Sequence, residues 1–378
     1  MSKDKDKNSV AEISKTPLHE EHLSLGATMA SFAGFDMPLQ YQGIVDEHLA
    51  TRESVGIFDV SHMATLRVRG EGAWQFLQKM LTNDLDKIED VGAAQYSLML
   101  DKGGHIIDDL IVYNTGAEFM LIVNASNAVT DLDWLRKHCP KDVEIFDESE
   151  RTALIAVQGP EALAVIAELA EVEEFEEDNV EDWTPPKRFY LAPLTMIGGA
   201  HMLVARTGYT GEDGVELIMH KDDAVAVWRA LMSFENVTPV GLGARDTLRL
   251  EMGYHLYGND MDRSRNPIEA GLGWVCPKVK TDYIGAEAVA KAREEGCKEK
   301  LVYLKITGGI PRAGYPVLDG EKQVGVVASG SHSPSLGVGI ATAYVPKRLA
   351  SEGTKLEIGI RKRKAEAEVV KPPFYKKD

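Results

Sequence analysis

The chain has 378 residues, of which 44% are hydrophobic, so it can bury a large core in two or three domains. Its formal net charge of -17 and pI near 5.1 argue against nucleic acid as a partner, because phosphate contacts need clustered Lys and Arg. No apolar run reaches the roughly 18 to 20 residues of a membrane span, so we expect no membrane partner.

Cysteine usage and the first residues indicate the compartment. Cys139, Cys276 and Cys297 stand at spacings that match no zinc or disulfide framework, which favours a reducing environment. The opening MSKDKDKNSVAEISK has no apolar segment and mixes acids with its lysines, unlike a secretory signal or a transit peptide. We therefore expect a cytoplasmic protein with a disordered tail over residues 1–15.

Residues 16–150 alternate between the helical and the extended period. Segments with helical spacing are 43–55, for which Gly56 is the expected stop, 70–81 and 126–138. Segments with strand character are 64–70, 94–101, 105–113 and 119–125. This order predicts a compact α+β unit.

After residue 150 a similar pattern begins again. TALIAVQGPEALAVIAEL predicts a strand, a Gly-Pro break and a helix, and it is followed by strands within 190–206 and 214–220 and a helix at 222–232. The similar order suggests a related, duplicated unit. From about residue 300, short strands and glycines are typical of a small all-β barrel or sandwich. The acid-rich stretch 168–182 is expected to be a solvated helix and loop.

The stretch HIIDDLIVY at 105–113 places two adjacent carboxylates in an otherwise apolar strand. Strict alternation puts Asp109 on the face of Ile107 and Asp108 on the face of Ile106. Burying an ionised carboxylate without a partner costs several kcal/mol, so each Asp needs donors, a shifted pKa or water. Either both accept hydrogen bonds from turn amides at the start of the strand, or one of them faces a ligand.

Several motifs give weak or negative signals. GLGARD at 241–246 has the glycines of a dinucleotide-binding turn without the rest of the fingerprint, and no Ser or Cys stands in a nucleophile elbow. His19 and His22 in HEEH could approach one metal, but no third ligand accompanies them, and an exposed helix face is the favoured interpretation.

Four glycine-rich, polar segments do not suit a packed core: FDVSHM (58–63), ARTGYTGEDGVEL (205–217), GLGARDTLRLEMG (241–253) and NPIEAGLGW (266–274). Within them, Tyr209 offers a stacking surface and Glu216 can accept paired N–H donors from a planar heterocycle. Arg245 could bind a carboxylate. The alternative is that Glu216 and Arg245 form an internal salt bridge.

Eight segments then identify a family by resemblance. They are FAGFDMPLQYQGI, FDVSHM, LIVNASN, QGP, ARTGYTGEDGVELI, GLGARDTLRLEMGYHLYGNDMD, NPIEAGLGWV and EVVKPPFY. Together they resemble the aminomethyltransferases, the T proteins of the glycine cleavage system, from about residue 16 to 376 and in the family's order. The resemblance implies an α+β fold with three domains around a central folate cavity.

The resemblance also implies the activity and its partners. The family takes an aminomethyl group from the lipoyl arm of H protein and transfers its one-carbon unit to tetrahydrofolate, a co-substrate, without metal or nicotinamide. The products are 5,10-methylenetetrahydrofolate, ammonia and dihydrolipoyl H protein. The implied domains are a folate-binding aminomethyltransferase region at 16–285, with an α+β subdomain at about 64–149, and a β-barrel domain at 286–378.

Site residues follow from the same resemblance. Asp109 matches the family's key carboxylate, and Asp108 then has a structural role. Glu216 is expected to hold the pterin ring, with Tyr209 in the same turn, and Arg245 to lie near the reacting end or the folate entrance. The residues expected to line the folate cavity are Met63, Tyr96 and Asn124.

Two local features leave alternatives open. The chain reads GGHIIDDL where the family usually reads GGIIDDL or GGVIDDL, so His105 is either a solvent-facing replacement or a group that tunes Asp109. In KRFY at 187–190 the spacing does not decide whether Phe189 or Tyr190 contacts folate. The basic run IRKRK at 360–364 is a candidate patch for an acidic carrier or an anionic folate tail.

Two other functions compete with this interpretation. One is a different tetrahydrofolate-dependent enzyme of the same superfamily, which removes methyl groups from sulfur or nitrogen donors. The other is a non-catalytic folate-binding protein for iron–sulfur assembly, whose Lys-Gly-Cys signature after NPIEAGLGW is missing from this chain. The DVSHM segment and the full GYTGEDG turn favour the T-protein family.

Overall fold

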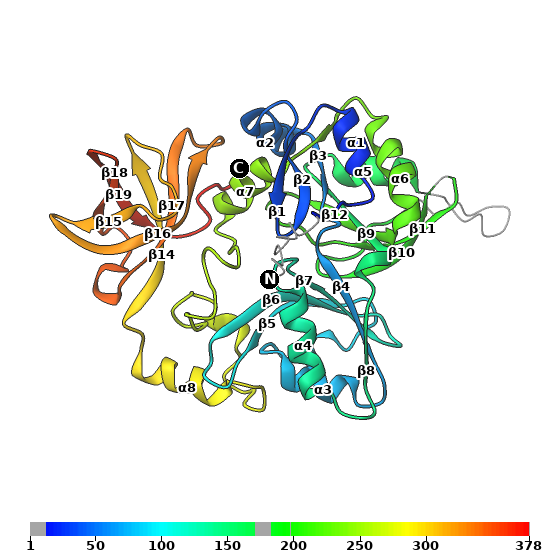
Figure 1. Cartoon of the computed structure of the whole chain (residues 1–378), viewed down its shortest axis with the longest axis horizontal. Helices are drawn as coiled ribbons and strands as arrows, with labels where there is room; N and C mark the ends of the chain where they lie inside the picture. Colours follow the sequence, from blue (N-terminus) through cyan, green and yellow to red (C-terminus); the bar gives the residue numbers. More distant parts are fainter. Residues whose placement is uncertain (1–12, 171–182, 197, 378) are drawn as a thin grey trace, which may run out of the picture.

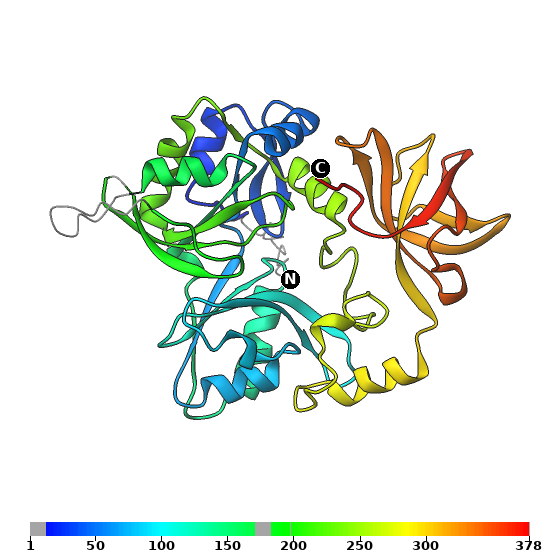
Figure 2. The same cartoon turned by 180° about the vertical axis from the view of Figure 1, so that it is seen from behind.

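A computed structural model describes residues 13–170, 183–196 and 198–377 in three parts, two α+β units and a β-barrel, that form the corners of a triangle (Figures 1 and 2). Most of the predicted tail and of the acidic stretch, residues 1–12 and 171–182, lies outside the described residues. Ser14, at the end of that tail, exchanges backbone hydrogen bonds with Gly34 and Asp36.

The first α+β unit is built on an antiparallel sheet of five strands in the order β5-β6-β7-β4-β8. Its strands are β4 (Ala64–Arg69), β5 (Ala94–Leu100), β6 (Ile106–Asn114), β7 (Phe119–Val123) and β8 (Glu144–Asp147). Its helices are α3 (Ala73–Met80), the 3-10 turn η1 (Leu85–Ile88) and α4 (Ala128–His138). The apolar side of α3 and the inner face of the sheet share one core, as the helical spacing at 70–81 predicts.

The second unit repeats this order of elements around a six-stranded sheet, β10-β11-β12-β9-β3-β13. Its strands are β3 (Val55–Asp59), β9 (Thr152–Gln158), β10 (Leu191–Met196), β11 (Ala200–Ala205), β12 (Gly214–His220) and β13 (Val237–Pro239). Its helical segments are η2 (Ser149–Arg151), α5 (Ala162–Leu169), η3 (Lys221–Asp223) and α6 (Ala224–Met232). In both units three consecutive antiparallel strands return to pair with the first strand, which confirms the predicted pair of related α+β units.

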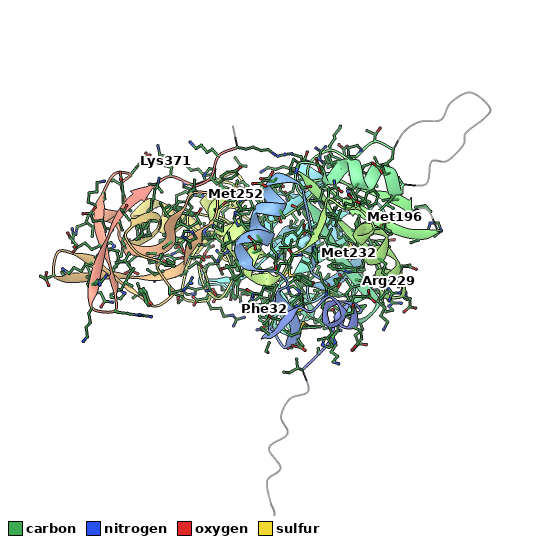
Figure 3. All side chains as sticks on the ribbon, turned by 90° about the horizontal axis from the view of Figure 1, so that it is seen from above. Phe32, Met196, Arg229, Met232, Met252 and Lys371 are labelled. Atoms are coloured by element: carbon green, nitrogen blue, oxygen red, sulfur yellow. The ribbon has the colours of Figure 1, made fainter. Side chains whose placement is uncertain are left out.

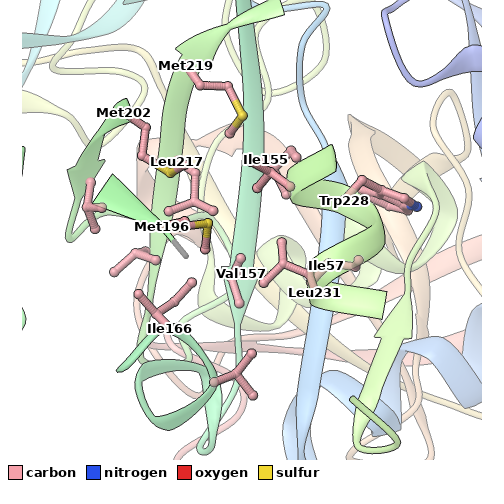
Figure 4. Close-up of a cluster of buried hydrophobic side chains, with 14 of the residues drawn as sticks. Ile57, Ile155, Val157, Ile166, Met196, Met202, Leu217, Met219, Trp228 and Leu231 are labelled. Atoms are coloured by element: carbon pink, nitrogen blue, oxygen red, sulfur yellow. The ribbon is translucent and has the colours of Figure 1, made fainter. Parts of the chain in front are cut away.

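The core of the second unit lies between this sheet and its helices. Figure 4 shows Ile155, Val157 and Leu217 of the sheet in one cluster with Met196 of β10, Ile166 of α5, and Trp228 and Leu231 of α6. All of these side chains are less than 4% exposed. Fully burying one such side chain contributes about 1.5–3 kcal/mol, so this cluster holds α5 and α6 to the sheet.

The N-terminal elements complete the second unit, and this region corrects two predictions. They are α1 (His19–Ser24), the hairpin β1 (Thr28–Phe32) and β2 (Phe35–Gln40), and α2 (Ile44–Glu53). The helix at 43–55 does not stop at Gly56, because Gly56 lies in β3, where a side chain would collide with Thr51. FDVSHM is also not a segment outside the core, since Phe58 and Val60 are 1% exposed.

The C-terminal strands form a closed barrel in the order β14-β17-β16-β15-β18-β19. They are β14 (Glu299–Thr307), β15 (Pro316–Asp319), β16 (Lys322–Ser333), β17 (Val338–Pro346), β18 (Lys355–Ile360) and β19 (Arg363–Val370), with η5 (Lys347–Leu349) between β17 and β18. The predicted α+β fold with a C-terminal barrel is confirmed. β18 and β19, which flank the basic run at 360–364, lie on the side of the barrel away from the two α+β units (Figures 1 and 2).

Three segments connect the barrel to the rest of the chain: α7 (Leu242–Met252), η4 (Gly273–Val275) and α8 (Ala286–Glu295). Seen from above, Met252 at the end of α7 lies at the junction and Lys371 follows the last barrel strand (Figure 3). Buried charges fix this junction, because Arg249 of α7 pairs with Asp260 at 2.6 Å and donates to Ser329 of the barrel. No helix of the described ranges is long and apolar enough to span a membrane.

Candidate functional site

Asp108 and Asp109 lie in the first half of β6, and a β-bulge decides which way the residues before them face. Leu98 pairs with Asp109 and Met99 with Asp108, but Leu100 pairs with Ile106, so Ile107 is the extra residue. The bulge reverses the predicted faces of the two isoleucines. Ile107 joins the core under Asp108, and Ile106 packs with Leu98 instead.

Two side chains hold the half-buried Asp109 carboxylate. Tyr96 on the neighbouring strand β5 donates its hydroxyl to Oδ2 at 3.0 Å, and the side-chain amide of Asn124 donates to Oδ1 at 2.8 Å. Tyr96 also stacks on Trp274, with ring centroids 5.8 Å apart, and the Trp274 residue is 66% exposed. The structure therefore brings the predicted residues Asp109, Tyr96 and Asn124 together at an accessible edge of the first unit.

Asp108 is fully buried on the opposite face and has different partners. It accepts hydrogen bonds from the Asn124 backbone N–H at 3.2 Å, the Asn124 side chain at 2.8 Å and the Asn127 side chain at 2.7 Å. The donors are an asparagine pair after β7, so the first alternative, turn amides at the start of β6, is wrong. Asn124 bridges both carboxylates and fixes their separation.

The environment of the two carboxylates raises the pKa of each. Burial, and then the neighbouring charge of Asp108, raise the pKa of Asp109 to about 7. Burial also raises the pKa of Asp108, although its hydrogen bonds oppose the shift. Among the described residues neither carboxylate forms an ion pair, so hydrogen bonds rather than a cation oppose their mutual repulsion. A carboxyl that titrates near neutrality can both hold and release a proton.

Glu216 lies on β12 of the second unit and is linked to β6 by hydrogen bonds. The Thr207 hydroxyl donates to Glu216 Oε2, and the hydroxyls of Thr207 and Tyr113 are 3.1 Å apart. Tyr113 belongs to the face of β6 that carries Asp109. No donor from the described part of the chain contacts Glu216 Oε1, which leaves one carboxylate oxygen for a ligand.

Tyr209 and Arg245 meet beside this glutamate. The Arg245 guanidinium lies over the Tyr209 ring, 4.8 Å from its centroid, and the Tyr209 hydroxyl donates to the carbonyl of His255. The predicted alternative of a salt bridge is not observed, because no ion pair joins Arg245 to Glu216 within the described residues. Arg245 Nη1 is buried there without a hydrogen-bond partner.

Met63 is half-buried and packs on the cluster that joins both α+β units to α7. That cluster contains Tyr113 and Ala244, the residue before Arg245. Its neighbour His62 is buried, and burial followed by the charge of Arg245 lowers the pKa of His62 to about 4. Met63 therefore packs on the cluster next to Arg245, whereas Tyr96 and Asn124 contact Asp109 directly.

His105 lies at the surface, whereas His19 and His22 are buried. His105 is exposed and its Nδ1 lies 3.3 Å from Asp101, which confirms the solvent-facing alternative. The expectation of an exposed HEEH face is wrong, since His19 and His22 are 4% and 0% exposed. They contact different acids, Asp36 and Asp59, because α1 packs on both β2 and β3.

Three residues near Asp109 were not predicted. Asn127 bonds to Asp108, Asp131 is buried behind it, and Trp274 covers Tyr96. Asn127 follows Asn124 by three residues, a spacing that could have indicated a shared partner. Asp131 gave no signal, since an acid in the first turn of a helix is ordinarily exposed. In KRFY, Tyr190 donates to Asp90 and Phe189 is 47% exposed.

The comparisons with known proteins agree with the family suggested by the sequence. The model described as the GCVT N-terminal domain matches residues 18–280, and the glycine cleavage T-protein C-terminal barrel domain matches residues 299–376. The chain belongs to the glycine cleavage T-protein family. It is 45% identical to an aminomethyltransferase of Halothermothrix orenii, over 95% of this chain and 99% of that protein.

Two further relatives support this assignment. An aminomethyltransferase of Chloroherpeton thalassium is 46% identical over 96% of this chain and 99% of its own length. The crystal structure of the glycine cleavage system aminomethyltransferase T from Bartonella henselae matches with a TM-score of 0.87 at 34% identity, covering 96% of this chain and 98% of that one. The resemblance predicted from the sequence is confirmed along nearly the whole chain.

A separate hollow of about 410 Å³ lies between residues 258–265 and the barrel. Two of its charged residues pair with each other, Arg265 and Glu299 at 2.7 Å, and Arg265 also lies over the Tyr344 ring. None of the predicted site residues lines it. Unpaired carboxylates and an unpartnered arginine instead mark the region between β6, β12 and α7.

Proposed function

We propose that the protein transfers the one-carbon unit of an aminomethyl group from the lipoyl arm of H protein to tetrahydrofolate. The products are 5,10-methylenetetrahydrofolate, ammonia and dihydrolipoyl H protein. The observation that carries this proposal is the Asp109 carboxyl, which Tyr96 and Asn124 hold by hydrogen bonds and which pairs with no cation of the described residues. Tetrahydrofolate-dependent aminomethyl transfer is the activity of the family to which the chain belongs.

Asp109 acts where charge develops on the reacting carbon. As ammonia leaves, that carbon becomes positive, and a fixed carboxylate next to it lowers the energy of the transition state. Two protons must also be redistributed among the folate nitrogens, the departing ammonia and the lipoyl sulfur. A carboxyl with a pKa of about 7 is suited to accept and return a proton at neutral pH.

Tetrahydrofolate would lie between the two α+β units. Glu216 Oε1 accepts the N–H groups of the pterin, and Tyr209 with Arg245 forms an adjacent stacked surface. Met63 contributes apolar contact, and Arg245 Nη1 supplies a donor for folate near the reacting end or the entrance. The residues fit the molecule because they offer an acceptor, an aromatic face and a cation in one place.

Two further aspects belong to this proposal. Residues 16–285 form the folate-binding aminomethyltransferase region, including the subdomain at about 64–149, and residues 286–378 form the barrel domain. The three cysteines are all unpaired, which suits a reducing compartment, and we place the protein in the cytoplasm.

The test is single-turnover formation of 5,10-methylenetetrahydrofolate from aminomethyl-loaded H protein and tetrahydrofolate. We expect product and ammonia in equal amounts. We expect no product from H protein whose lipoyl arm carries no aminomethyl group. A folded protein that binds tetrahydrofolate but forms no product would refute the proposed donor. Methyl transfer from dimethylglycine or sarcosine instead would indicate a demethylase.

A further inference from the structure

Asp131 is a buried acid behind Asp108, the neighbour of the candidate catalytic Asp109. It lies in the first turn of α4, where its backbone N–H bonds to Asn127, and the residue is 0% exposed. Neither carboxyl oxygen accepts a hydrogen bond from an N–H or O–H donor of the described residues. An ionised carboxylate in this position would be left without compensation, at a cost of several kcal/mol.

The partner of Asp131 is another carboxyl, Asp108, with which it shares a hydrogen bond. Two carboxyl groups can form such a bond only when one of them carries a proton. Asp108 already accepts three hydrogen bonds from Asn124 and Asn127, so its oxygens are stabilised as the anion. Asp131 has no such donors, and the proton therefore belongs to Asp131.

We propose that Asp131 is a protonated carboxylic acid that donates a hydrogen bond to Asp108 and thereby keeps Asp108 negatively charged beside Asp109. It acts as a positioning residue, since Asp108 and Asn124 stand between it and the reacting groups. Only the expected effect of Asp131 on turnover rests on the proposed role of Asp109. The protonation itself depends on the buried geometry alone.

The surrounding charges are consistent with this assignment. Burial, and then the charge of Asp108, raise the pKa of Asp131 to about 11. Asp109 adds to this shift and Arg263 opposes it, but Arg263 is exposed and forms no ion pair with Asp131 in the described ranges. In the described part of the chain, the other titratable groups that act on Asp108 and Asp109 include the hydroxyls of Tyr96, Tyr209 and Tyr257, which carry no charge at neutral pH.

The charge that Asp131 preserves has a consequence for catalysis. The Asp108 anion is the second cause, after burial, of the raised pKa of Asp109. If Asp108 were protonated, Asp109 would lose that repulsion and would become a weaker base. Asp131 thus influences the pKa of Asp109 through Asp108, without contacting Asp109 itself.

Two substitutions separate the hydrogen bond from the proton. Asp131→Asn keeps a neutral donor of the same shape, whereas Asp131→Ala removes the donor. We expect the asparagine variant to retain the wild-type pH profile of single-turnover transfer. We expect the alanine variant to shift the acidic limb of that profile to lower pH by about one unit, because Asp108 takes up the proton. Asp133→Asn, an exposed acid on the same helix, is the matched control.

Infrared spectroscopy tests the proton without any substrate. At pH 8 the wild-type protein should show the carbonyl stretch of a protonated, hydrogen-bonded carboxylic acid, and this band should disappear in Asp131→Asn but persist in Asp133→Asn. A wild-type spectrum without such a band would overturn the proposal, as would an Asp131→Asn profile like that of Asp131→Ala. If the wild-type protein showed this band but did not transfer aminomethyl groups, the result would count against the proposed function alone.

Discussion

Asp59 in β3 of the second α+β unit and Asp109 in β6 of the first lie in opposite electrostatic environments. Asp59 is 3% exposed and accepts hydrogen bonds from Thr16, from His22 at 2.9 Å and from the Ser61 backbone. Burial alone would raise its pKa, but the hydrogen bond and charge of His22 lower it below the ordinary value. Asp109 has two neutral donors and a carboxylate neighbour, and its pKa is raised to about 7.

This contrast separates a carboxylate that stabilises the fold from one that is available for chemistry. Asp59 contributes stability above the pKa of the unfolded chain, and that contribution is lost as the pH falls through its lowered folded pKa. Asp109 contributes to stability with the opposite sign, because its ionised form is disfavoured in the folded state. Its cost begins above the unfolded pKa and is complete above about pH 7. Sites that carry such uncompensated groups are candidates for function.

The largest expected effect is on turnover. Asp109→Asn removes the charge and the titrating proton but preserves the shape, so single-turnover transfer should fall by roughly 100-fold or more. Tetrahydrofolate affinity, measured by calorimetry, should change little. Asp101→Asn, a side chain with 38% exposure beside His105, is the control and should keep full activity. Near-normal turnover in Asp109→Asn would remove this residue from the catalytic role.

The matching change in the second unit should act on stability. Asp59→Asn leaves His22 buried beside a neutral amide, so we expect a loss of about 3–5 kcal/mol in the free energy of unfolding by urea. Asp222→Asn is the control, because Asp222 pairs with His220 at the surface and should cost less than about 1 kcal/mol. At pH 8, Asp109→Asn should raise the unfolding midpoint. If Asp59→Asn and Asp109→Asn both lowered the stability, the proposed difference between the two carboxylates would be wrong.

A smaller effect is expected for substrate binding across the two units. Glu216→Gln replaces an acceptor by a mixed donor and acceptor, which leaves pterin N–H groups poorly paired. Tetrahydrofolate binding should weaken by about 1–3 kcal/mol in calorimetric titration. The exposed Glu150→Gln is the control. Unchanged affinity of Glu216→Gln would exclude contact between this residue and the pterin.

The smallest expected effect concerns the hydroxyl of Tyr96. It lowers the pKa of Asp109 through its hydrogen bond, against the larger effects of burial and Asp108. Tyr96→Phe should therefore raise the pH of the acidic limb, by less than about one unit for a bond worth about 1 kcal/mol. The measurement is the pH profile of single-turnover transfer. A downward shift would mean that Tyr96 stabilises the protonated form.

Local patterns in the sequence determined the elements and the family. The alternation in 64–70 and 105–113 and the apolar spacing in 70–81 predicted β4, β6 and α3, because each pattern matches the period of one buried face. The order of eight segments indicated the family, and the family's key carboxylate in the strand at 105–113 indicated Asp109. Each of these features depends on a few neighbouring residues, so it can be recognised without knowledge of distant contacts.

Only the tertiary structure decided the environment of each polar group. The bulge at Ile107 reversed two side chains, since it arises from pairing with Leu100 on another strand. Gly56 became part of a buried strand because β9 and β13 lie on either side of it. Asp131, Asp108 and Asp109 meet although α4 and β6 are separate elements, and Asp59 finds His22 across 37 residues. A carboxylate's pKa depends on what surrounds it in space, and the sequence does not encode that locally.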